Sequence, residues 1–147
     1  DRPPQRRAYR MTELKRWREY LGIPLNLEPK FFPVPSEPAA TLILAVLARL
    51  GVEPALDIAG DCLRAVWAEE RDISAPATLR ELLAARSLDA EALMAHAASA
   101  EVAALFIMHS QEAISRGVFG APTYVLNDEL FWGQDRLDFL DRALART

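Results

Sequence analysis

Cysteine and histidine are scarce in this sequence, with one cysteine and two histidines among 147 residues. A single cysteine excludes an intrachain disulfide and a Cys-x-x-Cys redox pair within these residues. Cys62 lies in a stretch with the pattern of an amphipathic helix, which favours a buried structural thiol over a nucleophile. His96 and His109 lie in alanine-rich stretches without a nearby partner, so we expect both to be structural. No cluster of metal ligands is visible, and the sequence predicts no metal site.

The chain also lacks a long hydrophobic run and a strong excess of one charge. Its apolar run from Leu42 to Leu47 is too short to span a bilayer, and no signal peptide is visible. The formal net charge of −4 gives no attraction to nucleic acid or to an anionic membrane. We therefore expect a cytoplasmic protein without nucleic-acid or membrane partners. The first residue is Asp1 rather than Met, which suggests that a natural N-terminal segment precedes it.

The sequence is rich in apolar residues and carries a cluster of basic residues near its start. Apolar residues make up 51% of the chain, enough for a compact domain with a core. Basic residues crowd the start of the chain: Arg2, Arg6, Arg7, Arg10, Lys15, Arg16 and Arg18. One interpretation is a solvated helix face near a chain end. The alternative is a basic wall that attracts a carboxylate ligand.

Most of the chain has a helical pattern. Apolar residues recur every three or four positions over 11–21, where Thr12 can cap a helix that Gly22 ends. The segment 23–29 alternates apolar and polar residues, which predicts a short extended segment or edge strand. Further helices are expected from Ser36 to about Leu50, from Pro54 to about Glu70 and near Leu79–Ala85. In the second of these, Leu56, Leu63, Val66 and Trp67 are expected to face inward. Asp89 is expected to start another helix, and Ser99 to cap one that runs to Arg116 and is closed by Gly117.

The pattern changes near the C-terminus. Residues 123–126 (TYVL) and 130–132 (LFW) have strand character, and Asn127-Asp128 between them predicts a hairpin turn. Asp135 is a suitable N-cap for a last helix with Leu137, Leu140 and Leu144 facing inward. Two strands rarely bury enough surface to be stable alone, so we expect further strands from an N-terminal segment.

Two short segments carry candidate chemistry. In GVFGAPTY, a cis Ala121–Pro122 bond would leave the backbone N–H and C=O of Ala121 free to pair with an extended peptide; an ordinary trans-proline turn is the alternative. In FWGQDR, a strand ends at Gly133 and a helix begins near Asp135. The Asp135 carboxylate can bind the ammonium group of a ligand, while the backbone N–H groups at the helix start can bind the carboxylate of the same ligand. The alternative is that Asp135 is only the helix cap.

The segment GVFGAPTYVLNDELFWGQDRLDFL resembles the C-terminal motif of the 2-hydroxychromene-2-carboxylate isomerase family. Three other stretches, RAYRMTELKRW, FFP and WAEERDIS, resemble further segments of that family in the same order. The family belongs with the kappa-class glutathione transferases in the DsbA-like thioredoxin group. The resemblance implies an α/β thioredoxin-like fold with an all-helical insertion, from which the N-terminal βα portion is absent here. It divides the chain into residues 1–34 and 117–147 of the thioredoxin-like domain and a helical insertion over 35–116.

The resemblance also assigns site residues. Ala121 and Pro122 match the positions that pair with the cysteinyl part of glutathione, and Trp132, Gly133, Gln134 and Asp135 match the stretch that holds its γ-glutamyl end. Arg6 and Arg7 are candidates to hold a substrate carboxylate. Asp1 stands where the family has an asparagine near the ligand. The catalytic serine of the family has no counterpart in these residues, so the catalytic residue is unknown.

The implied activity is isomerisation of a small aromatic pyruvate-type substrate, with glutathione as a recycled cofactor and a homodimer as the assembly. One alternative is a kappa-like transferase or peroxidase that consumes glutathione. Another is a non-catalytic interaction module with the same fold. A thiol–disulfide oxidoreductase is disfavoured within these residues because Cys62 is the only cysteine.

Overall fold

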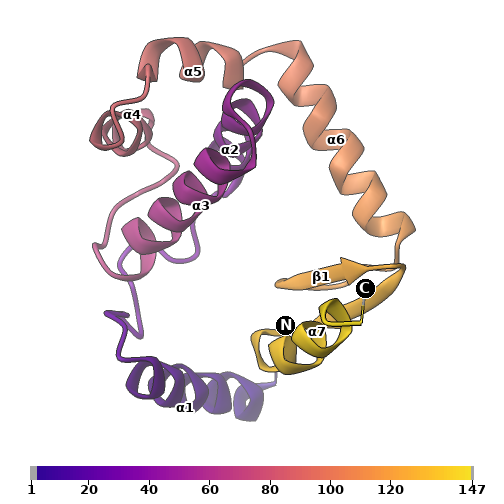
Figure 1. The fold of residues 1–147 in the computed structure, drawn as a ribbon. Coiled ribbons are helices and arrows are strands. Elements are labelled where there is room, and N and C mark those ends of the chain that lie inside the picture. The colour runs from indigo at the N-terminus through magenta and orange to yellow at the C-terminus, as the bar shows by residue number, and fades with distance from the viewer. Residues whose placement is uncertain (1–2, 147) are drawn as a thin grey trace. The chain divides into compact units, whose positions relative to one another are not determined.

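A computed structural model describes residues 3–146 of the chain. The described elements, in chain order, are α1 (Pro4–Leu21), α2 (Glu37–Leu50), α3 (Val52–Trp67), α4 (Pro76–Ala85), α5 (Ala90–Ala97), α6 (Ala100–Ser115), β1 (Thr123–Leu126), β2 (Glu129–Trp132), the 3-10 helix η1 (Gln134–Arg136) and α7 (Leu137–Leu144) (Figure 1). The backbone clusters into two compact units, and the boundary between Ala103 and Ala104 falls inside α6. The predicted three-part division of the chain stays a prediction.

Helix α1 is longer than its apolar pattern predicted. It begins at Pro4 rather than near Met11, because a proline at the first helical position has the required φ and no N–H that needs a partner. Thr12 therefore lies inside the helix, and its predicted capping role is wrong. Gly22 ends the helix with a φ of 63°, as expected for a left-handed C-cap.

The segment 23–29 is not a strand, so the edge-strand prediction is wrong. Its polar groups bond to the end of α3 instead of to a strand ladder. The Asn26 backbone N–H donates to the Trp67 carbonyl oxygen over 2.6 Å, and the Asn26 side-chain amide donates to the Ala68 carbonyl oxygen over 3.3 Å. The segment thus connects α1 to the helical block through the C-terminal end of α3.

Helices α2 to α5 form the helical block and carry most of the buried core. In Figure 1, α2 and α3 run side by side, and both contact the later helices of the block. Leu42 and Val46 of α2, Ile58 of α3, and Leu79 and Leu83 of α4 are almost completely buried. The predicted caps at Asp89 and Ser99 are confirmed, since these side chains accept backbone hydrogen bonds from Ala92 (3.0 Å) and Val102 (3.3 Å).

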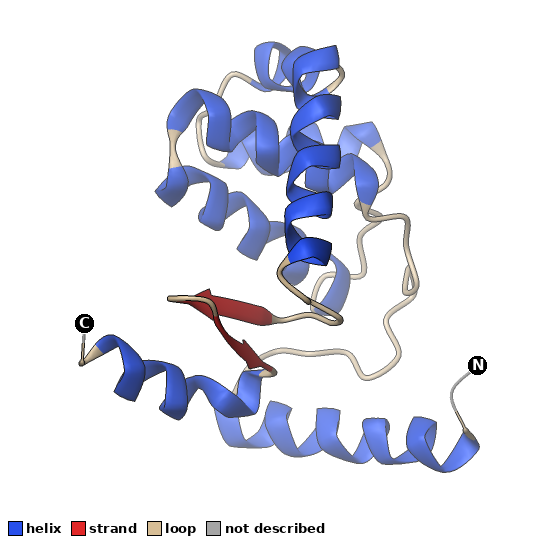
Figure 2. Ribbon diagram, turned by 90° about the vertical axis from the view of Figure 1, so that its right-hand side faces the viewer, coloured by secondary structure: helices blue, strands red, loops and turns tan. Residues whose placement is uncertain are grey.

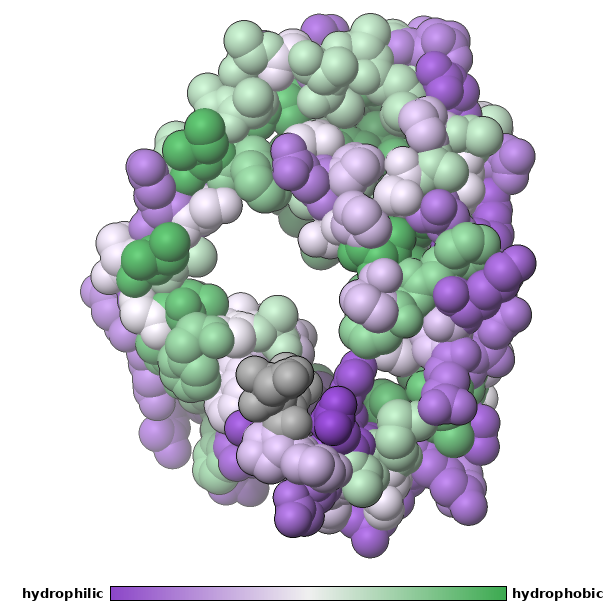
Figure 3. All heavy atoms as spheres, turned by 180° about the vertical axis from the view of Figure 1, so that it is seen from behind, coloured by the Kyte–Doolittle hydropathy of each residue, from purple (hydrophilic) through white to green (hydrophobic). Residues whose placement is uncertain are grey.

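Helix α3 is apolar on two faces, and the sequence alone placed its inward face only in part. Val66 is buried and Trp67 packs half-buried on the core, as predicted, whereas Leu56 and Leu63, also predicted inward, are each 63% exposed. Figure 3 likewise shows hydrophobic residues, in green, among the hydrophilic ones on the surface. The apolar spacing of this helix fits more than one face, and packing against α2 selects the side that contains Ile58.

A buried carboxylate links α3 to the residue that ends α4. Asp61 is 4% exposed and accepts two hydrogen bonds from the Arg86 guanidinium, one of them donated by Nη2 over 3.0 Å. The Arg64 Nη2 lies 2.9 Å from the same carboxylate. Hydrogen bonding from Arg86 lowers the pKa of Asp61 despite its burial. The carboxylate therefore stays charged inside the block and is held by two cations.

The second unit contains the predicted hairpin. Strands β1 and β2 pair in antiparallel register, with Tyr124 opposite Phe131 and Leu126 opposite Glu129. Asn127 and Asp128 both have positive φ, as a two-residue primed turn requires. Figure 2 shows α7 lying along the hairpin, and Phe131 on that sheet is 7% exposed. Of the leucines predicted inward on α7, Leu137 and Leu144 are 42% and 50% exposed, so that prediction is wrong for both.

Candidate functional site

The Ala121–Pro122 peptide bond is cis, so the alternative of an ordinary trans-proline turn is wrong. The Thr123 hydroxyl donates to the Gly120 carbonyl oxygen, which fixes the turn from the other side. Within residues 3–146 no hydrogen bond involves the backbone N–H or C=O of Ala121. The backbone N–H and C=O of Ala121 are thus available to form hydrogen bonds with an extended ligand, as a neighbouring strand would.

A second segment lies directly against this turn. The Gly133 backbone N–H donates to the Pro122 carbonyl oxygen over 2.9 Å, which joins the cis-proline turn to the end of β2. A Cβ on Gly120 would lie 2.6 Å from Trp132 Nε1, so only glycine permits this close approach of the indole. The Phe119 ring packs on the same indole, with ring centroids 4.9 Å apart. No role for Phe119 or Gly120 was predicted, although these two residues stand immediately before the Ala-Pro pair.

Asp135 is not a helix cap, so the predicted capping role is wrong. Residues 134–136 form a 3-10 turn, and α7 begins only at Leu137, with no side-chain cap at Arg136. The Asp135 carboxylate instead pairs with Arg136, with Oδ2 2.7 Å from Nη1. Its Oδ1 lies so close to Gly133 that a Cβ atom added to this glycine would be 2.5 Å from it. The side chain is half-exposed, so the carboxylate can still accept a ligand cation.

Together these residues form one strip, which we call the Ala121–Asp135 strip: Ala121, Pro122, Trp132, Gly133, Gln134 and Asp135. It offers an unpaired backbone rung, an aromatic wall and an exposed carboxylate in one unit. A peptide-like ligand with a free amino group matches these features, because its backbone can bond to Ala121 and its ammonium can bond to Asp135. The strip presents no group that would act as a nucleophile.

The other predicted site residues lie elsewhere in the chain. Arg6 and Arg7 are exposed on α1, in the first unit, and their role in holding a substrate carboxylate stays a prediction. Asp1 lies outside the described residues. Arg10, which the sequence analysis did not select, has its guanidinium carbon 5.2 Å from the Phe32 ring centroid and 5.9 Å from that of Trp67.

Arg10 also lines an apolar cavity of about 410 Å³ within the first unit. The cavity is formed by α1, the segment after it and the end of α3, and Leu14, Leu25 and Trp67 are among its lining residues. The proximity of Arg10 to Trp67 depends on the path of the chain between α1 and α3. Sequence spacing gives no signal for such a contact.

Both histidines lie outside the strip. His96 is 7% exposed, and its Nε2 has no hydrogen-bond partner among the described residues. His109 is exposed on α6, with Nδ1 4.0 Å from Glu112 Oε2, so the expectation that it has no nearby partner is wrong. Within residues 3–146 no group of three or more His, Cys, Asp or Glu side chains is arranged to hold a metal ion.

Cys62 is buried in α3, as predicted, and its burial makes it a poor nucleophile. Burial, and secondarily the Asp61 carboxylate, raise the pKa of the thiol to about 11. At pH 7 only about one such thiol in ten thousand is ionised, against a few per cent for a free cysteine. Alkylation by iodoacetamide at pH 7 is therefore expected to be at least about a hundredfold slower than for free cysteine. A rate equal to that of free cysteine in the folded chain, followed by mass spectrometry, would contradict the buried assignment.

The hairpin after a cis-proline, the terminal helix and the helical block define a thioredoxin-like fold with a helical insertion. Residues 2–145 match the model of the DsbA-like thioredoxin domain, and the chain belongs to this family. Two curated relatives are named 2-hydroxychromene-2-carboxylate isomerase. The one from Sphingobium xenophagum is 31% identical over 134 residues, covering 91% of this chain and 66% of its own length. The one from Pseudomonas putida is 32% identical over 142 residues, covering 94% and 65%.

Two solved structures are similar to this chain. A 2-hydroxychromene-2-carboxylate isomerase superposes with a TM-score of 0.70 and 28% identity, over 95% of this chain and 66% of that one. A cytosolic disulfide reductase, DsbM from Pseudomonas aeruginosa, solved with GSH, superposes with a TM-score of 0.60 and 28% identity, over 75% of this chain and 59% of that one. The chain thus spans slightly less than two thirds of the length of these relatives.

Within residues 3–146 no single helix is both long and apolar enough to cross a bilayer. Helices α5 and α6 have the length and apolar composition of a membrane span only when taken together, and the pair is bent by 61° at the break between them.

Proposed function

We propose that this chain binds glutathione at the Ala121–Asp135 strip and serves in isomerisation of 2-hydroxychromene-2-carboxylate-type compounds. The observation that carries the proposal is the Gly133–Pro122 hydrogen bond of 2.9 Å, because it joins the free Ala121 rung to the exposed Asp135 carboxylate. Glutathione has an extended peptide backbone and a γ-glutamyl ammonium, which match these two features. The names of the relatives support the isomerase part of the proposal.

Bound glutathione would supply a thiol whose ionised form can add reversibly to the unsaturated side chain of the substrate, allow rotation and leave unchanged. The chain's own part is to position that thiol. Ala121 fixes the cysteinyl backbone by paired hydrogen bonds, and Asp135 fixes the ammonium at the other end. Phe119 and Trp132 form an aromatic wall beside the Ala121 turn. Two anchoring points restrict rotation of the ligand and so orient its sulfur.

A second candidate function is reduction of disulfides or conjugation with consumption of glutathione. The observation in its favour is the structural likeness to the disulfide reductase solved with GSH. The Ala121–Asp135 strip would serve equally in that chemistry, because it contacts only the carrier of the thiol. Measurement of glutathione during turnover separates the two, since an isomerase leaves its concentration constant. A non-catalytic module would fail to bind glutathione at all in calorimetry.

We expect the 147-residue chain on its own to bind glutathione without isomerising a substrate. The thiol of glutathione has a pKa near 8.5, so only a few per cent is ionised at neutral pH unless a donor stabilises the anion. Next to the strip, the Thr123 hydroxyl already donates its hydrogen bond to the Gly120 carbonyl oxygen and is not free to stabilise a thiolate. The Cys62 thiol is buried in the other unit. Calorimetry with glutathione and an absorbance assay with an aromatic pyruvate test the two halves of this prediction.

A chimera supplies the positive control. The relatives exceed this chain by about one third of their own length, and a fusion of the remaining segment of the Pseudomonas putida relative to this chain provides the portion that the resemblance assigns to catalysis. Isomerisation by the chimera at constant glutathione concentration, lost without glutathione, is the expected result. Comparable turnover by the 147-residue chain alone would show that the group activating the thiol lies within these residues. The homodimer stays a prediction, for which sedimentation of the purified chain is the test.

A further inference from the structure

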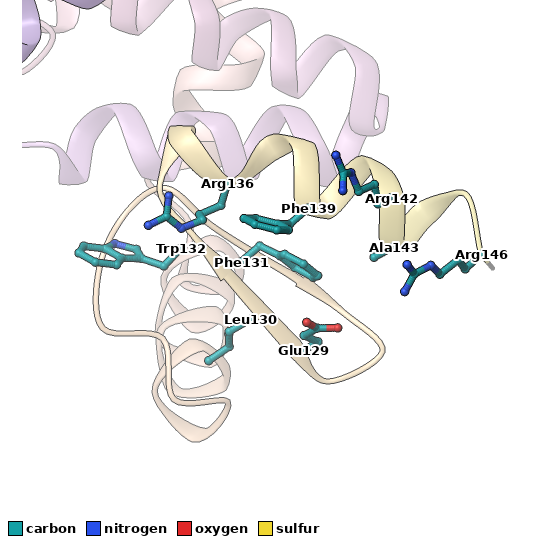
Figure 4. A pocket seen from close by; sticks show the side chains of 9 residues that line it. All are labelled: Glu129, Leu130, Phe131, Trp132, Arg136, Phe139, Arg142, Ala143 and Arg146. Carbon is teal, nitrogen blue, oxygen red and sulfur yellow. The ribbon is translucent and has the colours of Figure 1, made fainter.

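A cavity in the second unit is lined by residues of β2, by Arg136 and by α7, and Trp132 is the member of the Ala121–Asp135 strip that borders it. It has a volume of about 580 Å³ and runs between β2 and α7. Figure 4 shows the rings of Phe131 and Phe139 in its middle and arginine side chains towards both ends. A volume of this size is typical of sites for small organic ligands.

The arginines of this cavity differ in their partners. Arg136, at one end, pairs with Asp135 over 2.7 Å. Arg142 and Arg146, towards the other end, have no ion-pair partner among residues 3–146. By contrast, Arg116, in the same unit, is held by Glu112 and Asp128. The cavity therefore contains two guanidinium groups whose hydrogen-bond donors are available to a ligand.

The floor of the cavity is aromatic. Phe131 is 7% exposed and forms the base, whereas Phe139 is 58% exposed and borders the open space. A large exposed phenylalanine beside a buried one presents a surface on which a flat ring can pack. Glu129 lines the same cavity and opposes ligands of high negative charge.

We propose that the cavity between β2 and α7 binds an aromatic carboxylate of about naphthoate size. The ring packs on Phe131 and Phe139, and the carboxylate accepts hydrogen bonds from Arg142 and Arg146. Guanidinium groups match a carboxylate in geometry, because two N–H donors can bond to its two oxygens. One carboxylate suffices to satisfy the two free arginines, and Glu129 disfavours polyanions. The proposal does not depend on glutathione binding at the Ala121–Asp135 strip.

The test is calorimetric titration of the 147-residue chain with 2-naphthoate. We expect a Kd of about 1 mM or tighter for a ligand of this size. Arg142→Gln is expected to weaken binding about tenfold, because one charge-assisted hydrogen bond is lost, and the double variant with Arg146→Gln is expected to abolish it. Arg116→Gln removes the same charge from the same unit outside the cavity and should leave the affinity unchanged.

The uncharged probe 2-naphthalenemethanol separates carboxylate recognition from apolar packing. It keeps the ring but loses the contacts to both arginines, so it should bind more than about tenfold more weakly than 2-naphthoate, whereas Phe139→Ala should weaken both probes alike. Equal binding of the two probes would overturn the proposal, and so would unchanged affinity for 2-naphthoate in the double arginine variant. Absence of binding at several times the expected Kd would overturn it as well. Both arginines are exposed, so circular dichroism should show the variants to be folded.

Discussion

Replacement of Asp61 by alanine is expected to lower the free energy of unfolding by about 2 kcal/mol. The carboxylate is 4% exposed and holds the guanidinium groups of Arg64 and Arg86 at the contact between α3 and the end of α4. Loss of a partner from a buried pair costs more than this when the remaining charge cannot reach water. Here the two arginine side chains are 54% and 34% exposed and can be rehydrated in part, which reduces the penalty. Denaturation by urea, followed by circular dichroism, measures the change.

The control for this prediction is Glu81→Ala. The Glu81 carboxylate also pairs with an arginine, Arg71, over 2.6 Å, but its side chain is 70% exposed. Exposed pairs contribute at most about 1 kcal/mol, so the effect should be clearly smaller. Equal effects of the two substitutions would show that burial of Asp61 does not strengthen its contacts.

The difference between wild type and Asp61→Ala should also depend on pH. Hydrogen bonding from Arg86 holds the pKa of Asp61 below its ordinary value in the folded chain. A carboxylate with a lowered folded pKa stabilises the fold fully above its unfolded pKa of about 3.9, and this stabilisation is lost as pH falls towards the folded value. The stability difference should thus be constant from neutral pH to about pH 5 and shrink below about pH 4.

Replacement of Asp135 by alanine is expected to weaken glutathione binding by at least about tenfold, because a charge-assisted contact to the γ-glutamyl ammonium is lost. The sequence alone predicted a simultaneous loss of stability, since Asp135 was expected to cap the last helix. The structure removes that expectation: among the described residues 3–146 the carboxylate caps no helix and pairs only with Arg136, a half-exposed partner. Calorimetry with glutathione and urea denaturation measure the two quantities separately.

Asp138→Ala is the matched control for Asp135→Ala. Asp138 lies in the first turn of α7, is exposed and carries the same charge. Its removal should leave glutathione affinity unchanged within about twofold, since it lies outside the strip. Unchanged affinity in Asp135→Ala would remove Asp135 from the proposed site, and a large loss of stability there would restore a capping role.

Local patterns predicted the local features of the fold well. The hairpin, its Asn127-Asp128 turn and the caps at Asp89 and Ser99 are confirmed, because each depends on residues within a few positions of one another. The cis bond before Pro122 is confirmed as well. The errors concern features that depend on distant residues. The segment 23–29 bonds to the end of α3 rather than to a strand, and no local pattern contains that partner.

The amino-acid sequence by itself determined the helices, the hairpin and their order, with the segment 23–29 as the exception, and it predicted the residues of the Ala121–Asp135 strip. It did so because turn chemistry, helix periodicity and a specific motif are carried by neighbouring residues. Only the tertiary structure decided which face of α3 is buried, since its leucine spacing fits two faces and packing selects one. It also decided that Asp135 is free of a capping role and that Phe131, Phe139, Arg142 and Arg146 line one cavity. The cavity follows from how α7 packs on the hairpin, and the periodicity of a helix does not specify the strands on which it packs.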